Sequence, residues 1–117
     1  MNQDTITPGK TTVAMDVLVT IAKLTTLQVP GVSRMSHTPS RQVKRLLHRQ
    51  IDDGVEISVE DEVVRVDLYL VIENGYNLRE VGRNIQHEVA RAISDMIGMQ
   101  VGWINVHIED IDYVVEK

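Results

Sequence analysis

The apolar residues recur along the chain with two periods, one typical of helices and one typical of strands. From Met15 they follow steps of three and four residues, which predicts a helix that ends at Pro30 and Gly31. Residues 55–59 and 64–72 alternate between apolar and polar, as half-buried strands do. The short acidic turn between these two segments predicts a β-hairpin.

A second helix and a last strand are predicted after the hairpin. Asn77, with Glu80 three residues later, has the arrangement of a capping box, and Gly98 is placed as a C-terminal cap. Residues 103–111 then alternate as a strand. The apolar stripes of the two helices consist of Val17, Leu18, Ile21, Leu24, Leu27 and Val29 in the first, and of Leu78, Val81, Ile85, Val89, Ala92, Ile93 and Met96 in the second.

Three shorter segments complete the predicted elements. Residues 10–14 are expected to form a short strand, and residues 32–35 a second one. Thr38 and Pro39 favour a helix start, so residues 38–51 are expected to be helical, with one apolar arc opposite a basic one. The apolar arc consists of Val43, Leu46, Leu47 and Ile51.

This order of elements favours an α+β fold. One apolar stripe per helix and one apolar face per strand predict two layers, with two helices packed on one face of a small mixed β-sheet in the order β-α-β-arm-β-β-α-β. The connection from the hairpin through the second helix to the last strand is expected to be a right-handed crossover if those strands are parallel. The 117 residues form one domain at 10–112, with a flexible lead at 1–9, an inserted basic arm at 33–53 and a tail at 113–117.

The composition excludes several classes of function. Without cysteine the chain has no disulfide, no thiol nucleophile and no thiolate metal site. Without phenylalanine its core must be aliphatic. Its longest apolar run is far shorter than the about 20 residues that span a membrane, and its start is polar, so a cytoplasmic location is expected.

Charge is distributed unevenly along the chain. The net charge is −5, yet residues 33–51 carry five basic residues and no acidic one. Such a segment is typical of a solvated arm or of an interaction surface. An acidic protein or an anionic membrane face would suit it, whereas nucleic acid is less favoured because the segment has no aromatic side chain to stack on a base. The candidate partner-binding residues are Arg41, Lys44, Arg45 and Arg49.

The candidate catalytic and metal motifs are incomplete. The Gly-Lys-Thr at residues 9–11 resembles the end of a phosphate-binding loop, but Asp4 occupies the position of the required first glycine. His107 and Glu109 alternate onto one face of the last strand and supply only two metal ligands, too few for a stable site. We therefore expect no enzyme activity, no cofactor and no metal.

The second face of the long hairpin strand is a candidate for self-association. It is too apolar for free solvent and too charged for a core. Symmetric contact with another copy is the simplest use of such a face. The candidate residues are Val63, Tyr69 and Val71.

A series of short segments carries a family resemblance. The most specific are Val-Gly-Arg-Asn-Ile-Gln at residues 81–86 and Val-Gly-Trp-Ile-Asn-Val-His-Ile at residues 101–108. Together with residues 10–22, 29–32, 54–57 and 66–75, they resemble the alkaline shock protein family of bacterial envelope stress response proteins.

That resemblance implies an abundant, self-associating cytoplasmic protein of mostly Gram-positive bacteria, linked to envelope stress. In some members a separate anchor protein holds it at the inner face of the membrane, and no catalytic residue is attached to the family. We therefore expect a non-enzymatic structural or interaction protein on the cytoplasmic side of the cell envelope, with homo-oligomers and a membrane-anchored partner. The alternative is a small nucleic-acid-binding domain that uses the basic arm at residues 34–49.

Overall fold

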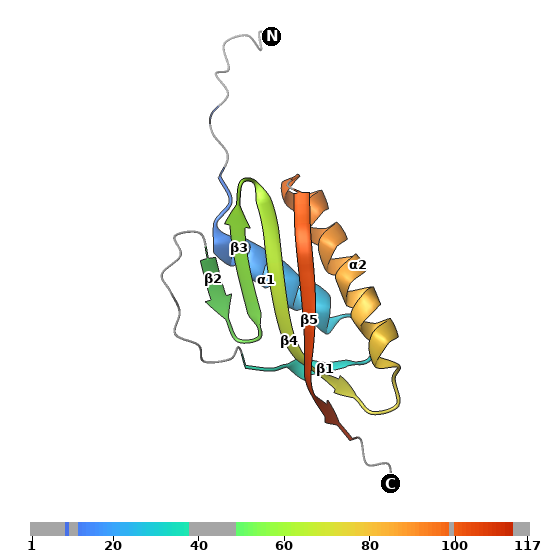
Figure 1. Ribbon diagram of the computed structural model, residues 1–117. Coiled ribbons are helices and arrows are strands. Elements are labelled where there is room, and N and C mark those ends of the chain that lie inside the picture. The colour runs from blue at the N-terminus through green and yellow to red at the C-terminus, as the bar shows by residue number, and fades with distance from the viewer. Residues whose placement is uncertain (1–8, 10–11, 38–48, 99, 114–117) are drawn as a thin grey trace, which may run out of the picture.

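The computed structural model describes residues 9, 12–37, 49–98 and 100–113. Its elements, shown in Figure 1, are α1 (Met15–Leu27), β1 (Val32–Met35), β2 (Arg49–Asp52), β3 (Val55–Glu60), β4 (Val63–Glu73), α2 (Leu78–Ile97) and β5 (Gln100–Asp112). The two main helices, the strand at 32–35, the hairpin and the last strand are therefore confirmed, and the last strand is longer than its alternation predicts.

The predicted hairpin is formed by β3 and β4 through a two-residue turn. Glu60 pairs with Val63, and Asp61 and Glu62 between them have φ values of 51° and 64°. Positive φ at both central residues is the geometry of a type I′ turn, whose twist matches that of the flanking strands. Alternation from this turn buries one face of β4 completely, namely Val64, Val66, Leu68, Leu70 and Ile72.

The central strand of the five-stranded mixed sheet is β4. One of its edges pairs in parallel with β5, the arrangement for which the sequence predicts a right-handed crossover. Its other edge pairs antiparallel with β3 at residues 63–68 and then with β1 at residues 70–72. The sheet ends with β2, which pairs with β3.

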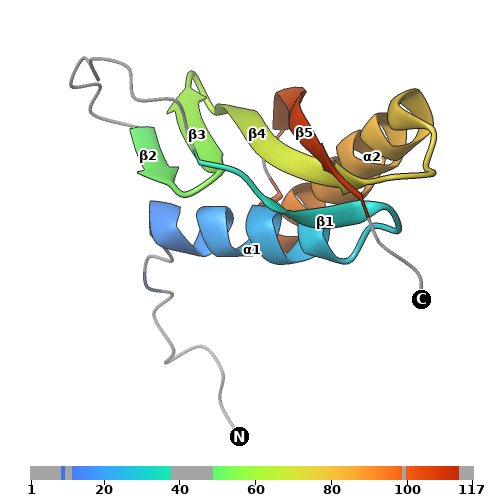
Figure 2. The same ribbon diagram turned by 90° about the horizontal axis from the view of Figure 1, so that it is seen from below.

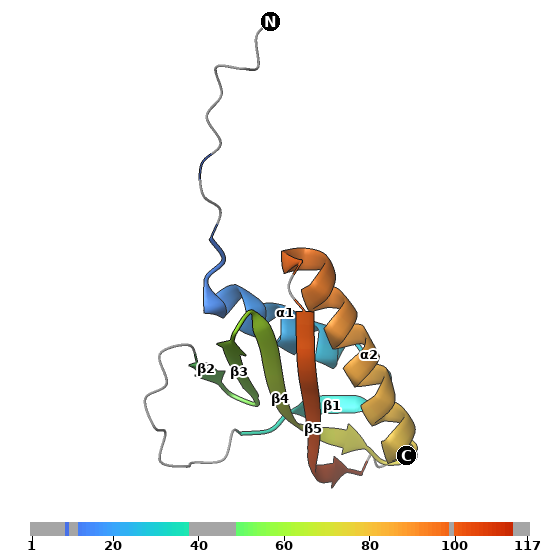
Figure 3. The same ribbon diagram turned by 45° about the horizontal axis from the view of Figure 1, so that its top comes forward.

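Both helices lie on the same face of the sheet, as Figure 2 shows, which confirms the two-layer α+β fold. α2 runs alongside β5, and α1 crosses behind the strands (Figure 3). The core between the layers is aliphatic, and each fully buried side chain of this kind contributes about 1.5–3 kcal/mol. From α2 it receives Val81, Ile85, Val89 and Ile93.

α2 begins and ends at the capping residues that the sequence predicts, Asn77 and Gly98. The Asn77 side chain accepts a hydrogen bond from the Glu80 backbone amide at 2.9 Å. Gly98 has a left-handed φ of 70°, and its N–H donates to the Ser94 carbonyl at 2.9 Å. These contacts satisfy backbone groups that the helix itself leaves without partners.

The side of α1 that faces the core differs from the predicted stripe. Its buried residues are Leu18, Val19, Ala22 and Thr26. A threonine is tolerated there because its hydroxyl donates to the Ala22 carbonyl at 2.7 Å. Three members of the predicted stripe point to solvent instead, and Val17, Leu24 and Leu27 are 44%, 55% and 39% exposed.

Two predictions for short segments are wrong. Residues 12–14 form no strand, because β-propensity alone does not make a strand without a neighbour to pair with; residues 10–11 lie outside the described residues. Residues 49–51, expected to end a helix, belong to β2, where backbone pairing with β3 overrides the helical pattern. The rest of the expected arm helix, at 38–48, lies outside the described residues.

Candidate interaction surface

The face of the sheet opposite the helices carries polar and aromatic side chains of β4 and β5. In the parallel register of these strands, alternate residues lie side by side, and those between the fully buried residues of β4 point away from the helix layer. We call this surface the open face. Its paired residues are Arg65 with Trp103, Asp67 with Asn105, and Tyr69 with His107.

A carboxylate, that of Asp67, lies at the centre of the open face. One of its oxygens accepts a hydrogen bond from the Asn105 side-chain amide at 3.1 Å and lies 3.1 Å from Nε2 of His107. The other oxygen lies 3.6 Å from Nε of Arg65. The Asp67 side chain is only 15% exposed, so these groups take the place of water around it.

The ring of His107 is held from a second direction by Tyr69. The two ring centroids lie 4.4 Å apart, and the planes differ by 11°, which is a stacked arrangement. Stacked rings of this kind contribute about 0.5–1.5 kcal/mol beyond the area they bury. Stacking and the contact with Asp67 together fix the position of this histidine.

The single tryptophan of the chain extends the open face into solvent. Trp103 is 63% exposed, and its neighbour in register, Arg65, has a side chain that is 59% exposed. Tryptophan, tyrosine and arginine are the residues that most often dominate protein–protein binding energy. Their grouping on one uncovered sheet face is what a protein-binding surface requires.

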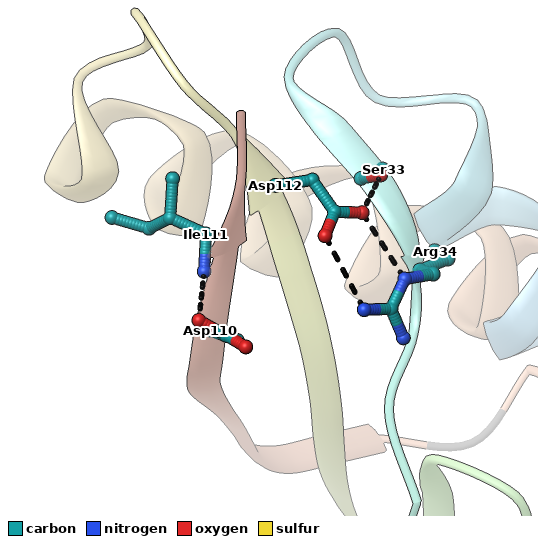
Figure 4. Close-up of polar contacts among 5 residues, drawn as sticks. All are labelled: Ser33, Arg34, Asp110, Ile111 and Asp112. Carbon is teal, nitrogen blue, oxygen red and sulfur yellow. Dashed lines mark hydrogen bonds and ion pairs between the residues drawn. The ribbon is translucent and has the colours of Figure 1, made fainter. Parts of the chain in front are cut away.

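A second polar cluster joins the ends of β1 and β5 at one end of the sheet (Figure 4). Asp112 accepts hydrogen bonds from the Ser33 hydroxyl at 2.6 Å and from the Arg34 guanidinium at 3.1 and 3.3 Å. The bonds from Arg34, and then that from Ser33, hold the pKa of Asp112 below its ordinary value. The hydrogen bond to Asp112, and then the negative charge of Asp112, raise the pKa of Arg34.

The Asp67–His107 pair resembles two parts of a catalytic triad. A triad also needs a nucleophile at the other ring nitrogen. In the part of the chain that the structure describes, the contacts of His107 are with the Asp67 carboxylate and the Tyr69 ring, and neither is such a nucleophile.

The expected alternation of His107 and Glu109 onto one face of the last strand is interrupted. A register shift between the pairs Leu70–Ile108 and Val71–Asp110 places Glu109 in an irregularity of β5, which breaks the alternation. Asp112, near this pair in the sequence, is bonded to Ser33 and Arg34 instead. Within residues 9, 12–37, 49–98 and 100–113, no group of three or more metal-ligating side chains is present.

The basic arm contributes little to the described surface. Arg41, Lys44 and Arg45 lie outside the described residues, and Arg49 begins β2, where only its backbone is described. Arg34 is the basic residue of this segment whose side chain can be placed, and it is paired with Asp112.

The three candidate self-association residues do not form one apolar patch. Val63 is half-buried at the start of β4, and Tyr69 is stacked on His107. Val71 is only 2% exposed and has almost no surface to offer a second copy. Charged Arg65 and Asp67 lie between Val63 and Tyr69 along the strand.

Periodicity did not predict the Asp67 cluster, which consists of Asp67 with Arg65, Asn105 and His107. Its members come from two strands that are far apart in the sequence. A signal was present, since Asp67 interrupts a long aliphatic strand and Asn105 and His107 alternate in the last one. Only the parallel register brings these two signals together.

The fold defines a small α+β domain that covers one side of its sheet with helices and carries the polar and aromatic residues of the open face on the other side. A model of the alkaline shock protein 23 family, described as having a cell envelope-related function, matches residues 3–113. The chain therefore belongs to this family. In the described part of the chain, no helix has the length and apolarity that crossing a membrane requires.

The relatives include proteins of Bacillus subtilis and Streptococcus pyogenes. The Bacillus subtilis (strain 168) protein YqhY is 26% identical over 106 residues, covering 90% of this chain and 78% of that protein. Spy1535 of Streptococcus pyogenes serotype M6 is 28% identical over 110 residues, covering 93% and 82%. Among solved structures, a MamM CTD variant has a TM-score of 0.49 and 13% identity over 83% of this chain and 98% of its own, values too low to transfer a function.

Proposed function

We propose that this chain is a non-enzymatic interaction protein on the cytoplasmic side of the cell envelope. In this role it self-associates, binds a membrane-anchored partner and takes part in the response to envelope stress. Its family membership supports the link to the envelope.

The observation that carries this proposal is the exposed Trp103 on the open face. A large aromatic side chain that is 63% exposed beside an arginine is costly to leave in water and suited to binding protein. The neighbouring Asp67, Tyr69 and His107 are already fixed by one another, so little side-chain entropy is lost when a partner docks.

The test compares two variants of a fluorescently tagged copy in its own bacterium. Trp103→Ala is expected to change a peripheral signal at the membrane into a diffuse one. Met96→Ala is the matched control, because Met96 is 64% exposed but lies on α2 in the helix layer. A Trp103→Ala copy that stays at the periphery would contradict the role of the open face.

The basic arm is proposed as a second contact with the same envelope partner. Replacing Arg41, Arg45 and Arg49 together by Gln is expected to leave the thermal melt unchanged and to abolish salt-sensitive binding to isolated membranes. The alternative, nucleic acid, predicts binding of RNA that falls about 10³-fold or more between 50 and 200 mM salt. Binding of RNA with unchanged binding of membranes in the triple variant would favour that alternative.

A further inference from the structure

One side of α1, turned away from the core, carries an apolar stripe. Val17, Leu24 and Leu27 are 44%, 55% and 39% exposed, and Val13, just before the helix, is 46% exposed. At about 100° per residue, these helical positions and Thr20 fall within an arc of about 80°, opposite the buried residues. A helix that is apolar on opposite sides is normally buried on both.

The spacing of this stripe indicates what covers it. From Val13 through Val17, Thr20 and Leu24 to Leu27, the steps are four, three, four and three residues. This is the spacing of the narrow seam along which one helix packs against another. A helix that lies in a lipid surface has a broader apolar side and a strongly basic polar side, and α1 has a single lysine.

The charges beside the stripe favour one particular helix. Asp16 and Lys23 lie on the same flank, seven residues apart, and neither has an ion-pair partner among the described residues. When a second α1 packs antiparallel, with a two-fold axis near Thr20, Asp16 of each copy lies opposite Lys23 of the other. A parallel pair would set these two charges beside uncharged Ile21 and Gln28.

We propose that two copies of this chain associate through antiparallel α1 helices, packed along Val13, Val17, Thr20, Leu24 and Leu27. This inference rests on the self-association proposed above and assigns it to the helix layer, leaving the open face for a different partner. A single helix pair is a small interface, so the dimer is reversible and depends on concentration.

Sedimentation velocity of the full chain over a wide concentration range tests the proposal. Leu24→Glu is expected to raise the Kd of the dimer at least about 100-fold, because each copy loses a buried leucine and two carboxylates are brought close to the axis. Measured well below the wild-type Kd, where both chains are monomeric, its thermal melt is expected to match that of the wild type, since Leu24 is 55% exposed in the single chain. Met96→Glu, on the exposed end of α2, is the control and is expected to leave the Kd unchanged.

A charge exchange tests the antiparallel orientation. Lys23→Asp places acidic groups opposite one another and is expected to raise the Kd roughly three- to tenfold. The double variant Asp16→Lys, Lys23→Asp restores opposite charges and is expected to return the Kd to within about twofold of the wild type.

The possible failures are distinguishable. A wild-type chain that is monomeric at every concentration overturns both the self-association and its assignment to α1. A dimer that is insensitive to Leu24→Glu and to Lys23→Asp overturns the assignment alone. A monomeric wild type that binds vesicles of anionic phospholipid, with binding lost in Leu24→Glu, identifies lipid as the occupant of the stripe and also overturns the inference.

Discussion

Asp112 connects the end of β5 to neighbouring segments through both its side chain and its backbone. It accepts hydrogen bonds from Ser33 and Arg34 on β1, and its own backbone carbonyl accepts one from the Asn74 amide at 2.8 Å. The end of β5 is thereby tied to β1 across the end of β4, although the two strands do not pair with each other. The bonds from Ser33 and Arg34 to the carboxylate are charge-assisted and therefore stronger than neutral ones.

Removing the arginine should therefore move the titration of Asp112. In Arg34→Gln, the pKa of Asp112 is expected to rise toward its ordinary value, because the largest cause of its lowering is lost. Ser33→Ala is expected to raise the same pKa by less, since the Ser33 bond is the smaller cause. The carboxyl carbon shift of Asp112, followed by NMR between pH 2 and 6 (about the range in which an aspartate titrates), measures both.

The sign of the effect on stability follows from the direction of the shift. A carboxyl group whose pKa is lower in the folded chain stabilises it above the unfolded pKa, and this contribution is lost as the pH falls through the folded pKa. The wild type should lose more stability on acidification below about pH 4 than Arg34→Gln does. Equal losses in the two proteins would show that this pair does not contribute.

At the scale of elements, one backbone position decides how three strands meet. Tyr69 in β4 donates its N–H to the Gly54 carbonyl and accepts at its own carbonyl from the Ser36 amide, both at 2.8 Å. Here β1 ends and β3 begins on the same edge of β4. Gly54 has a φ of 81°, and a Cβ there would lie 2.6 Å from the Ser36 carbonyl oxygen and 2.9 Å from that of Tyr69.

Two glycine substitutions separate backbone strain from this close approach. Gly75 has a φ of 100° but open space around it, so Gly75→Ala is expected to cost only the strain, about 1 kcal/mol. Gly54→Ala meets two backbone oxygens as well and is expected to cost about 1–3 kcal/mol more. Urea denaturation of both variants measures the difference. Equal losses in the free energy of unfolding would mean that the backbone around Gly54 moves to accommodate a Cβ at no cost.

Alternation and caps were sufficient to predict β4, α2 and the hairpin, because in these elements sequence period and burial agree. For α1 they predicted the helix but not its buried side, because a helix that is apolar on opposite sides has a period that does not tell which side faces the sheet. They failed also for residues 49–51, where pairing with β3 outweighs a short helical pattern. The Asp67 cluster required the parallel register, which no local pattern contains.

At the scale of the whole molecule, the two-layer fold separates the two proposed surfaces. Figure 2 shows the sheet and α1 in separate layers. The open face belongs to the sheet, and the exposed stripe of α1 lies opposite the residues that this helix buries against the core. Two copies joined through α1 would therefore point their open faces away from the contact between them. Such a dimer carries two open faces and therefore two sites for the proposed membrane-anchored partner.

Membrane retention should then depend on both surfaces for different reasons. Trp103→Ala is expected to weaken binding to isolated membranes while leaving the Kd of the dimer unchanged, because it alters the open face alone. Leu24→Glu keeps the open face intact, yet it is expected to bind the same membranes at least about tenfold more weakly, since a monomer loses the gain from a second attachment. Co-sedimentation with membranes over a range of protein concentrations measures both effects. Should Leu24→Glu bind as tightly as the wild type at concentrations where the wild type is dimeric, the paired copies do not bind two partners at once.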